Sequence, residues 1–208
     1  MFVVLDGPNG SGKTTVLSRL EGPVGRFEKI HKFRLPGHSA GFSQILRRIL
    51  VEEAAEHNLD ELTRRLLYAA DQRDFITRYS DLLRSKDELV LLDRWDLSTL
   101  AYAMTHGFKD TTFLTTLLTV TSGRMKPTVT IYMDAPAMVL AERCQQRGAK
   151  NQDIALEEAK LEELRQYYEA AMRMQEPWGS LGRLVKLWTE RTSPDGVVQT
   201  IRAILEDL

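Results

Sequence analysis

A glycine-rich stretch near the N-terminus has the composition of a phosphate-binding loop. Residues 7–14, GPNGSGKT, match the pattern G-x-x-x-x-G-K-[ST] at every specified position. The apolar run at 2–5 is typical of a buried strand, and a helix is predicted over 13–20. Glycines let backbone N–H groups converge on an anion, and the N-terminus of the following helix adds partial positive charge. The sequence therefore predicts that this phosphate loop binds a nucleoside triphosphate.

Each residue type in the phosphate loop suits one part of that ligand. Lys13 can reach the β- and γ-phosphates, and the hydroxyl of Thr14 is a ligand for Mg²⁺. The predicted triphosphate-binding residues here are Gly7, Pro8, Asn9, Gly10, Ser11, Gly12, Lys13, Thr14 and Thr15. The alternative is a glycine-rich surface turn, and the strand and helix that flank the loop argue against it.

A second group that could perform chemistry follows the apolar run at 89–92. This run ends in Asp93, and an acid at the end of a neighbouring strand can hold Mg²⁺ in such folds. A hydrolytic enzyme often has a glutamate next, but Arg94 stays protonated and cannot act as a base. Its guanidinium can instead clamp a phosphate with two hydrogen bonds. Arg34, at the end of the second predicted strand, is another candidate phosphate ligand. The alternative for both arginines is an ordinary surface ion pair.

Strands alternate with helices along the whole chain, which predicts a parallel sheet with helices on both faces. The expected strands are 2–5, 27–33, 88–93, 128–133 and 185–188. The expected helices are 13–20, 42–50, a long helix capped by Asn58 or Asp60 and ending near 83, 96–106, 111–122, 136–146, 154–174 and 195–208. We therefore expect an α/β fold of the P-loop NTPase type. It would have three layers and a five-stranded sheet, all in one domain over 1–208.

Composition excludes several other classes of protein. The net charge of −1 and the absence of a long basic block argue against a nucleic-acid-binding surface. No apolar run approaches the ~20 residues of a membrane span. A single cysteine, Cys144, excludes an internal disulfide and fits a reducing compartment. Because the first strand follows Met1 directly, there is no room for a signal peptide, and we expect a cytoplasmic protein.

Five motifs in order resemble the thymidylate kinase family, over about residues 1–175. Besides the phosphate loop they are FRLPG at 33–37, LLYAAD at 66–71, DRWDLSTLAY at 93–102 and PTVTIYMD at 127–134. They are similar to that family's R-E-P-G, L-L-F-A-A-[DN]-R, D-R-[YH]-x-x-S-x-x-A-Y and P-D-L-T-I-Y-L-D stretches. The resemblance implies transfer of the γ-phosphoryl group of ATP to dTMP, with Mg²⁺. It also implies a lid at about 143–154 and a homodimer. Leu46, Ile49 and Leu50, or the long helix, are candidates for the dimer face.

The resemblance assigns a role to each matching position. Arg94 and Arg34 would hold the acceptor phosphate, Tyr68 would stack on the base, and Tyr102 would close against the sugar. The implied acceptor-binding residues are Asn9, Phe33, Arg34, Tyr68, Gln72, Arg73, Arg94, Ser98, Thr99 and Tyr102. The implied catalytic residues are Lys13, Asp93, Arg94 and Arg147, with Thr14 and Asp93 as metal ligands. Arg143 and Arg191 would lie near the adenine of ATP.

The chain also departs from the family pattern at the base and sugar side. Asn9 stands where the family usually has aspartate. The asparagine keeps a hydrogen bond but loses the charge. Gln72 replaces the arginine that contacts the thymine edge. Arg73 is rotated by about 100° around the helix and cannot simply take over. Further departures are Leu35, Gln145 and Gln152.

Three other functions remain open at this stage. The same reaction could use dUMP, a modified pyrimidine nucleotide or a purine deoxynucleotide, because Gln72 alters the base contact. An ATP-driven switch or transport ATPase would be expected to show a glutamate after Asp93, or an L-S-G-G-Q or N-K-x-D signature, and none is present. A non-catalytic nucleotide-binding module would have no need of the intact set of Lys13, Thr14, Asp93 and Arg94.

Overall fold

Five parallel strands form a single sheet in the computed structural model, which describes residues 1–123, 125–146, 157–175 and 180–208. The strand order is β2-β3-β1-β4-β5. The strands are β1 (Phe2–Asp6), β2 (Ile30–Arg34), β3 (Leu89–Asp93), β4 (Val129–Asp134) and β5 (Arg183–Trp188). Every residue of β1, β3 and β4 is buried, as expected for parallel strands that are covered on both faces. The predicted five-stranded parallel sheet is confirmed.

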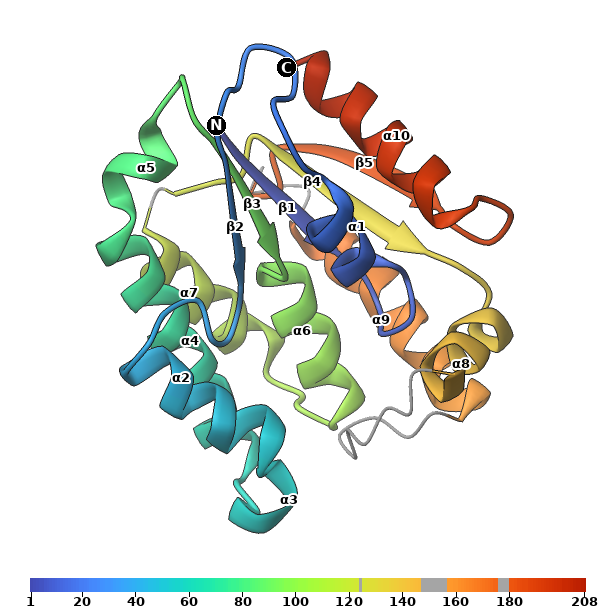
Figure 1. Cartoon of the computed structure of the whole chain (residues 1–208). Coiled ribbons are helices and arrows are strands. Elements are labelled where there is room, and N and C mark those ends of the chain that lie inside the picture. The colour runs from blue at the N-terminus through green and yellow to red at the C-terminus, as the bar shows by residue number, and fades with distance from the viewer. Residues whose placement is uncertain (124, 147–156, 176–179) are drawn as a thin grey trace.

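Helices cover both faces of this sheet (Figure 1). They are α1 (Lys13–Arg19), α2 (Phe42–Arg47), a π-helical turn η1 (Arg48–Glu52), α3 (Ala54–His57), α4 (Glu61–Arg78), α5 (Ser80–Arg84), α6 (Asp96–Thr105), α7 (Thr111–Ser122), α8 (Ala137–Gln146), α9 (Glu158–Gln175) and α10 (Pro194–Glu206). Helices α1 and α10 pack on one face of the sheet, and α4, α6 and α9 pack on the other. The fold is therefore the predicted α/β arrangement.

The register of the central strands brings the two predicted motifs together. Leu5 on β1 lies opposite Asp93 on β3, and Arg34 on β2 lies opposite Asp93 from the other side. Because all strands are parallel, their carboxyl ends meet at one edge of the sheet, where ligands bind in such folds. The phosphate loop leaves β1 at this same edge.

Among the predicted elements that differ from the structure are the second strand and the long helix. The second strand begins at Ile30 rather than at 27, because Phe27 pairs with Val24 in an isolated bridge and packs into the core beneath α10. The long helix predicted to end near 83 is divided at Tyr79 into α4 and α5. Asp60 caps α4, as one of the two predicted alternatives, by accepting a hydrogen bond from the backbone N–H of Thr63 at 3.0 Å.

Of the two candidates for a dimer face, the one at 46–50 is mostly turned inward. Leu46 and Leu50 are buried in the core of the chain itself, and Ile49 is half-buried. The outward side of α2 carries Phe42 and Ile45 instead. All of these residues share one broad apolar side of a helix, by the helical period. The packing of α2 against α4 decides which part of that side is buried. Among the described residues, no helix is long and apolar enough to cross a membrane.

Candidate active site

A cavity of about 270 Å³ opens at the carboxyl edge of the sheet, between the phosphate loop, α4 and α6. Most of the predicted acceptor-binding residues line it, namely Asn9, Arg34, Tyr68, Gln72, Arg94, Ser98, Thr99 and Tyr102. Lys13, Thr14 and Asp93 line the same cavity. The residues predicted to hold a nucleotide's phosphates and those predicted to hold an acceptor therefore share one site.

Phe33 and Arg73 were also predicted to bind the acceptor, and the structure places both outside this cavity. The ring of Phe33 packs against Phe75 and Tyr79, with centroids 5.2 and 4.5 Å apart. Side chains alternate along a strand, so Phe33 points away from the side to which Arg34 points. Arg73 is exposed to solvent, because one helical step separates it from Gln72. Neither side chain is positioned to contact an acceptor in this cavity.

The phosphate loop is held in a narrow conformation that excludes side chains at two of its glycines. A Cβ atom on Gly7 would lie 2.1 Å from the carbonyl oxygen of Met133, and one on Gly10 would lie 2.6 Å from that of Leu140. Both glycines also have positive φ angles. The loop therefore closes tightly against β4 and α8 before its last residues enter α1, where Thr15 follows Lys13 and Thr14.

Lys13 folds back over the phosphate loop. Its Nζ donates hydrogen bonds to the carbonyl oxygens of Gly7 and Pro8, both at 2.7 Å, and to Ser11 Oγ at 3.1 Å. Burial, together with the positive charge of Arg94, lowers the pKa of Lys13 to about 7. A bound phosphate would supply the negative charge that this buried ammonium group needs.

Arg94 is aimed at the phosphate loop by an unusual backbone conformation. Its φ of 76° lies in the left-handed region, which is rare for a residue other than glycine and is found mainly at functional sites. The guanidinium donates to Asn9 Oδ1 at 2.6 Å and to Ser98 Oγ at 3.0 Å. It also lies over the ring of Tyr102, 5.0 Å from the centroid. Asn9 thus accepts a hydrogen bond from Arg94 although it lacks the charge of the aspartate in the family pattern.

The two predicted metal ligands are bridged by one cation. Arg34 donates through Nε to Asp93 Oδ2 at 3.0 Å and through Nη2 to Thr14 Oγ1 at 2.7 Å. The other carboxylate oxygen of Asp93 is buried and has no hydrogen-bond partner among the described residues. No group of three or more acidic, histidine or cysteine side chains there forms a separate metal cage. One carboxylate and one hydroxyl fit Mg²⁺, which keeps water and phosphate oxygens as its other ligands.

The end of the cavity at which a base is predicted to stack, here called the base end, is built by α4 and α6. Arg65 lies over the ring of Tyr68, 5.0 Å from the centroid, and is buried with an ion pair to Glu61 at 2.5 Å. It also donates to the backbone oxygen of Thr99 on α6, at 3.4 Å. Arg65 was not predicted from the sequence, although its three-residue spacing from Tyr68 on a helix could have suggested it. Arg65 holds the aromatic ring of Tyr68 in place at the wall of the cavity.

Two buried groups beneath the phosphate loop were also missed from the sequence. Asp6 ends β1 and accepts hydrogen bonds from the backbone N–H groups of Gly7 and Trp95, at 2.9 and 3.2 Å. The hydroxyl of Tyr168 on α9 donates to the carbonyl oxygen of Gly7 at 2.9 Å and lies 2.8 Å from Ser98 Oγ. Burial raises the pKa of both Asp6 and Tyr168. Asp6 could have been found as an acid at a strand end, but no sequence signal connects Tyr168 to the loop.

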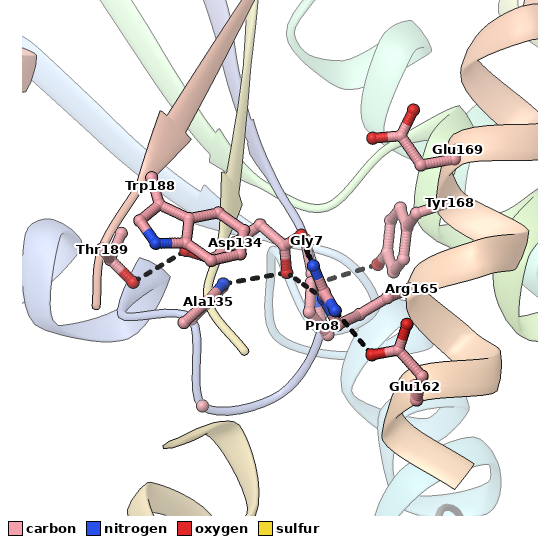
Figure 2. A network of polar contacts seen from close by, with 12 residues as sticks. Gly7, Pro8, Asp134, Ala135, Glu162, Arg165, Tyr168, Glu169, Trp188 and Thr189 are labelled. Atoms are coloured by element: carbon pink, nitrogen blue, oxygen red, sulfur yellow. Dashed lines mark hydrogen bonds and ion pairs between the residues drawn. The ribbon is translucent and has the colours of Figure 1, made fainter. Parts of the chain in front are cut away.

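A polar network fixes α9 at the edge of the sheet, as Figure 2 shows. Arg165 forms a two-pronged ion pair with the carboxylate of Asp134, at 3.0 Å through both Nε and Nη2. The same guanidinium contacts Glu162 and lies over the ring of Trp188, 5.4 Å from the centroid. Because paired hydrogen bonds of this kind restrict orientation, they hold α9 where Tyr168 reaches Gly7.

The residues predicted to lie near the adenine are only partly assembled in the described structure. The guanidinium of Arg143 on α8 donates hydrogen bonds to the hydroxyl of Thr189 at 3.0 Å and to the backbone oxygen of Thr189 at 2.7 Å. These bonds link α8 to the turn after β5. Arg191, in the same turn, is almost fully exposed. Arg147 and most of the predicted lid lie outside the described residues.

The family model and the relatives that match this chain all carry the same family description. The family model described as "Thymidylate kinase" matches residues 5–181. Thymidylate kinase of Staphylococcus haemolyticus is 30% identical over 173 residues, which cover 79% of this chain and 82% of that protein. Thymidylate kinase of Latilactobacillus sakei subsp. sakei is 32% identical over 176 residues, covering 80% and 79% respectively. Thymidylate kinase of Vibrio campbellii is 30% identical over 149 residues, covering 71% and 70%.

Proposed function

Because the chain belongs to the thymidylate kinase family, we propose that it transfers the γ-phosphoryl group of ATP to dTMP and releases ADP and dTDP. The observation that carries this proposal is the composition of one cavity. Lys13 and Arg94 lie at its phosphate end, and Tyr68 and Gln72 lie at its other end. A site with this order of groups suits two phosphates that meet at the sheet edge and one base that stacks between helices.

The chemistry needs positioning and charge neutralisation more than acid–base catalysis. A phosphate monoester is already a nucleophile, so no strong general base is required. Lys13 would neutralise the β- and γ-phosphates, and Arg94 would hold the acceptor phosphate with its planar fork. Both cations are held by hydrogen bonds before any ligand arrives, which reduces reorganisation during the reaction.

Magnesium is expected to accompany ATP. Thr14 and Asp93 would hold it, since the guanidinium of Arg34 brings them together and one buried oxygen of Asp93 has no hydrogen-bond partner in the described part of the chain. When bound, Mg²⁺ neutralises phosphate oxygens during transfer. Arg34, whose guanidinium contacts both groups, lies where it can bind the acceptor phosphate.

At the acceptor end, Tyr68 would stack on the base, and Ser98, Thr99 and Tyr102 would line the base and sugar positions. Gln72 favours one alternative within the same reaction, because it differs from the arginine of the family pattern. That alternative is another deoxynucleoside monophosphate, such as dUMP. Arg143 and Arg147 would supply cations of the lid over ATP, which would exclude water on closure.

A homodimer is also proposed, through a face that includes the long helix α4, which was one of the two candidates from the sequence. Neighbouring helices carry exposed apolar side chains on this face: Phe42 and Ile45 on α2, Leu62 and Leu66 on α4, and Phe113 and Val120 on α7. Apolar residues gathered on a surface often mark an interface between proteins. Size-exclusion chromatography with light scattering should give a dimer for the wild type and a monomer for Leu66→Lys. A monomeric wild type would contradict the proposal.

The first test is a coupled ADP-release assay with Mg-ATP and a panel of monophosphates: dTMP, dUMP, dCMP, dGMP, dAMP and UMP. We expect the strongest stimulation with dTMP. Stimulation by another member would keep the reaction and change the acceptor, whereas no stimulation by any member would overturn the proposed kinase. Lys13→Met, purified in parallel, controls for contaminating kinases.

A further inference from the structure

Gln72 is held by a partner that lies behind it. Gln72 lines the cavity from α4, and its Nε2 donates to Asp96 Oδ1 at 2.8 Å. Asp96 begins α6, is 4% exposed, and is not among the described residues that line the cavity. This is the one hydrogen bond that the side chain of Gln72 makes to other described residues. Its carbonyl oxygen and its second N–H are therefore left for a ligand in the cavity.

The hydrogen bond to Asp96 sets the orientation of the carboxamide of Gln72. An ionised carboxylate accepts hydrogen bonds and cannot donate them, so Asp96 holds the nitrogen end and not the oxygen end. The free edge of the amide then offers one N–H and one carbonyl oxygen in a set order. Thymine and uracil present an acceptor, O4, beside a donor, N3–H. Cytosine presents a donor, its 4-amino group, beside an acceptor, N3, which is the opposite order.

We propose that Asp96 is a positioning residue that locks the carboxamide of Gln72, so that Gln72 recognises the O4 and N3–H edge of thymine or uracil and rejects cytosine. The inference rests on the proposed function, because dTMP as acceptor decides which of the two orders is matched. Asp96 itself touches no substrate in this proposal. It acts only through the orientation of Gln72.

The geometry of α4 supports contact between Gln72 and a stacked base. Tyr68 and Gln72 are four residues apart and lie on the same side of the helix, and both line the cavity. A base that stacks on Tyr68 therefore has its edge within reach of Gln72. The two side chains would fix the plane and the hydrogen-bonding edge of the base respectively.

The surroundings of Asp96 add a feature that can be measured. Burial, with the negative charge of Asp6 from β1, raises the pKa of Asp96 to about 7, although the hydrogen bond from Gln72 on α4 opposes this. Below that pH the carboxyl group is protonated and can donate to the carbonyl oxygen of Gln72. The amide is then free to turn round, and discrimination between the two pyrimidine edges should weaken.

The test compares kcat/KM for dTMP with kcat/KM for dCMP, using Mg-ATP and the full chain. In Asp96→Asn, the amide that replaces the carboxylate can either donate or accept a hydrogen bond. The amide of Gln72 therefore loses its fixed orientation. We expect the dTMP/dCMP ratio to fall roughly tenfold to hundredfold, the range of one well-formed two-point base contact. The matched control is Asp110→Asn, which removes the same charge from the cap of α7, and it should leave the ratio unchanged.

A pH profile of the wild type tests the proposal without any variant. The dTMP/dCMP ratio should rise through about pH 7, and it should be flat for Asp96→Asn. Ionisation of the acceptor phosphate and of Lys13 affects both substrates alike and cancels in the ratio. A ratio independent of pH in the wild type, or an unchanged ratio in folded Asp96→Asn, would overturn the inference. A wild type that phosphorylates no monophosphate of the panel would instead overturn the proposed function.

Discussion

The two ends of the cavity are built from different kinds of structure. The phosphate end consists of backbone and buried charged side chains at the carboxyl ends of β1 and β3, where the phosphate loop, Asp93 and Arg94 are each within a few residues of a strand. The base end consists of side chains on two helices, with Tyr68 and Gln72 on α4 facing α6. The first end is anchored by the sheet, and the second depends on how two helices pack.

This difference explains where the chain keeps the family pattern and where it departs from it. A change in the phosphate loop would meet backbone atoms at 2.1 and 2.6 Å, so its glycines have little freedom to vary. At the base end, Gln72 stands on a helix where the family pattern has an arginine, so no strand depends on this position. Asp96 accepts the hydrogen bond of the glutamine. We therefore expect the phosphate end to set the class of reaction and the base end to set the acceptor.

The largest effect is expected at Lys13. Lys13→Met keeps the aliphatic packing but removes the charge that would face the β- and γ-phosphates. We expect kcat to fall about a thousandfold, the upper range for the loss of one preorganised electrostatic contact. Steady-state kinetics with Mg-ATP and dTMP measure it, with the exposed Lys32→Met as the control. Near-normal turnover would show that the phosphate end does not control the reaction.

A smaller loss is expected for Arg94→Lys. Lysine keeps the charge but cannot reproduce the fork that reaches Asn9 and Ser98. Loss of one charged hydrogen bond costs about 3 kcal/mol at most, so kcat/KM for dTMP should fall roughly a hundredfold. Arg19→Lys, at an exposed ion pair, provides the control. Equal activity of Arg94→Lys and the wild type would exclude two-point phosphate binding by this residue.

Tyr168→Phe tests whether α9 supports the phosphate end. The change removes the hydroxyl that donates to Gly7 and contacts Ser98, while Lys13 and Arg94 still donate to these two partners. We expect the free energy of unfolding to fall by about 1–2 kcal/mol and kcat/KM to fall about tenfold. Urea unfolding and kinetics measure the two effects. Tyr167→Phe, whose hydroxyl makes an exposed contact with Glu163, should change the stability by less than about 0.5 kcal/mol.

Gln72→Arg should separate the two ends most sharply. It restores the residue of the family pattern at the base end and leaves the phosphate end untouched. We expect kcat/KM for dTMP to change by less than about tenfold, with an unchanged KM for ATP, because a single edge contact is altered. Arg73→Gln, on the exposed side of α4, should change neither value. A base preference that is the same for Gln72→Arg and the wild type would show that position 72 does not select the acceptor.

The smallest expected signal is a proton taken up at the phosphate end. Because burial lowers the pKa of Lys13 to about 7, this side chain is mostly neutral at pH 8 before ligand binds. Bound phosphates raise its pKa, so binding of Mg-ATP should take up close to one proton at pH 8 and much less at pH 6. Calorimetry in two buffers of different ionisation enthalpy measures the uptake. Uptake that persists in Lys13→Met would assign the proton to another group.

The sequence alone identified what depends on short spacing. The phosphate loop, Asp93 with Arg94, and the alternation of strands with helices are all encoded by neighbouring residues and by local periodicity. The covalent chain places Lys13 next to Thr14 in any fold, and continuous apolar runs such as 89–92 require cover on both faces. These features therefore predicted the parallel sheet, and they placed the phosphate-binding residues at one edge of it.

Only the tertiary structure decided which distant side chains meet. Tyr168 contacts Gly7 across 161 positions of sequence, and Gln72 contacts Asp96 across 24. Packing also turned Phe33 and Arg73 away from the cavity, although both stand beside residues that line it. The physical reason is that periodicity defines the faces of a strand or helix, whereas the partner of each face is chosen by packing of the whole chain.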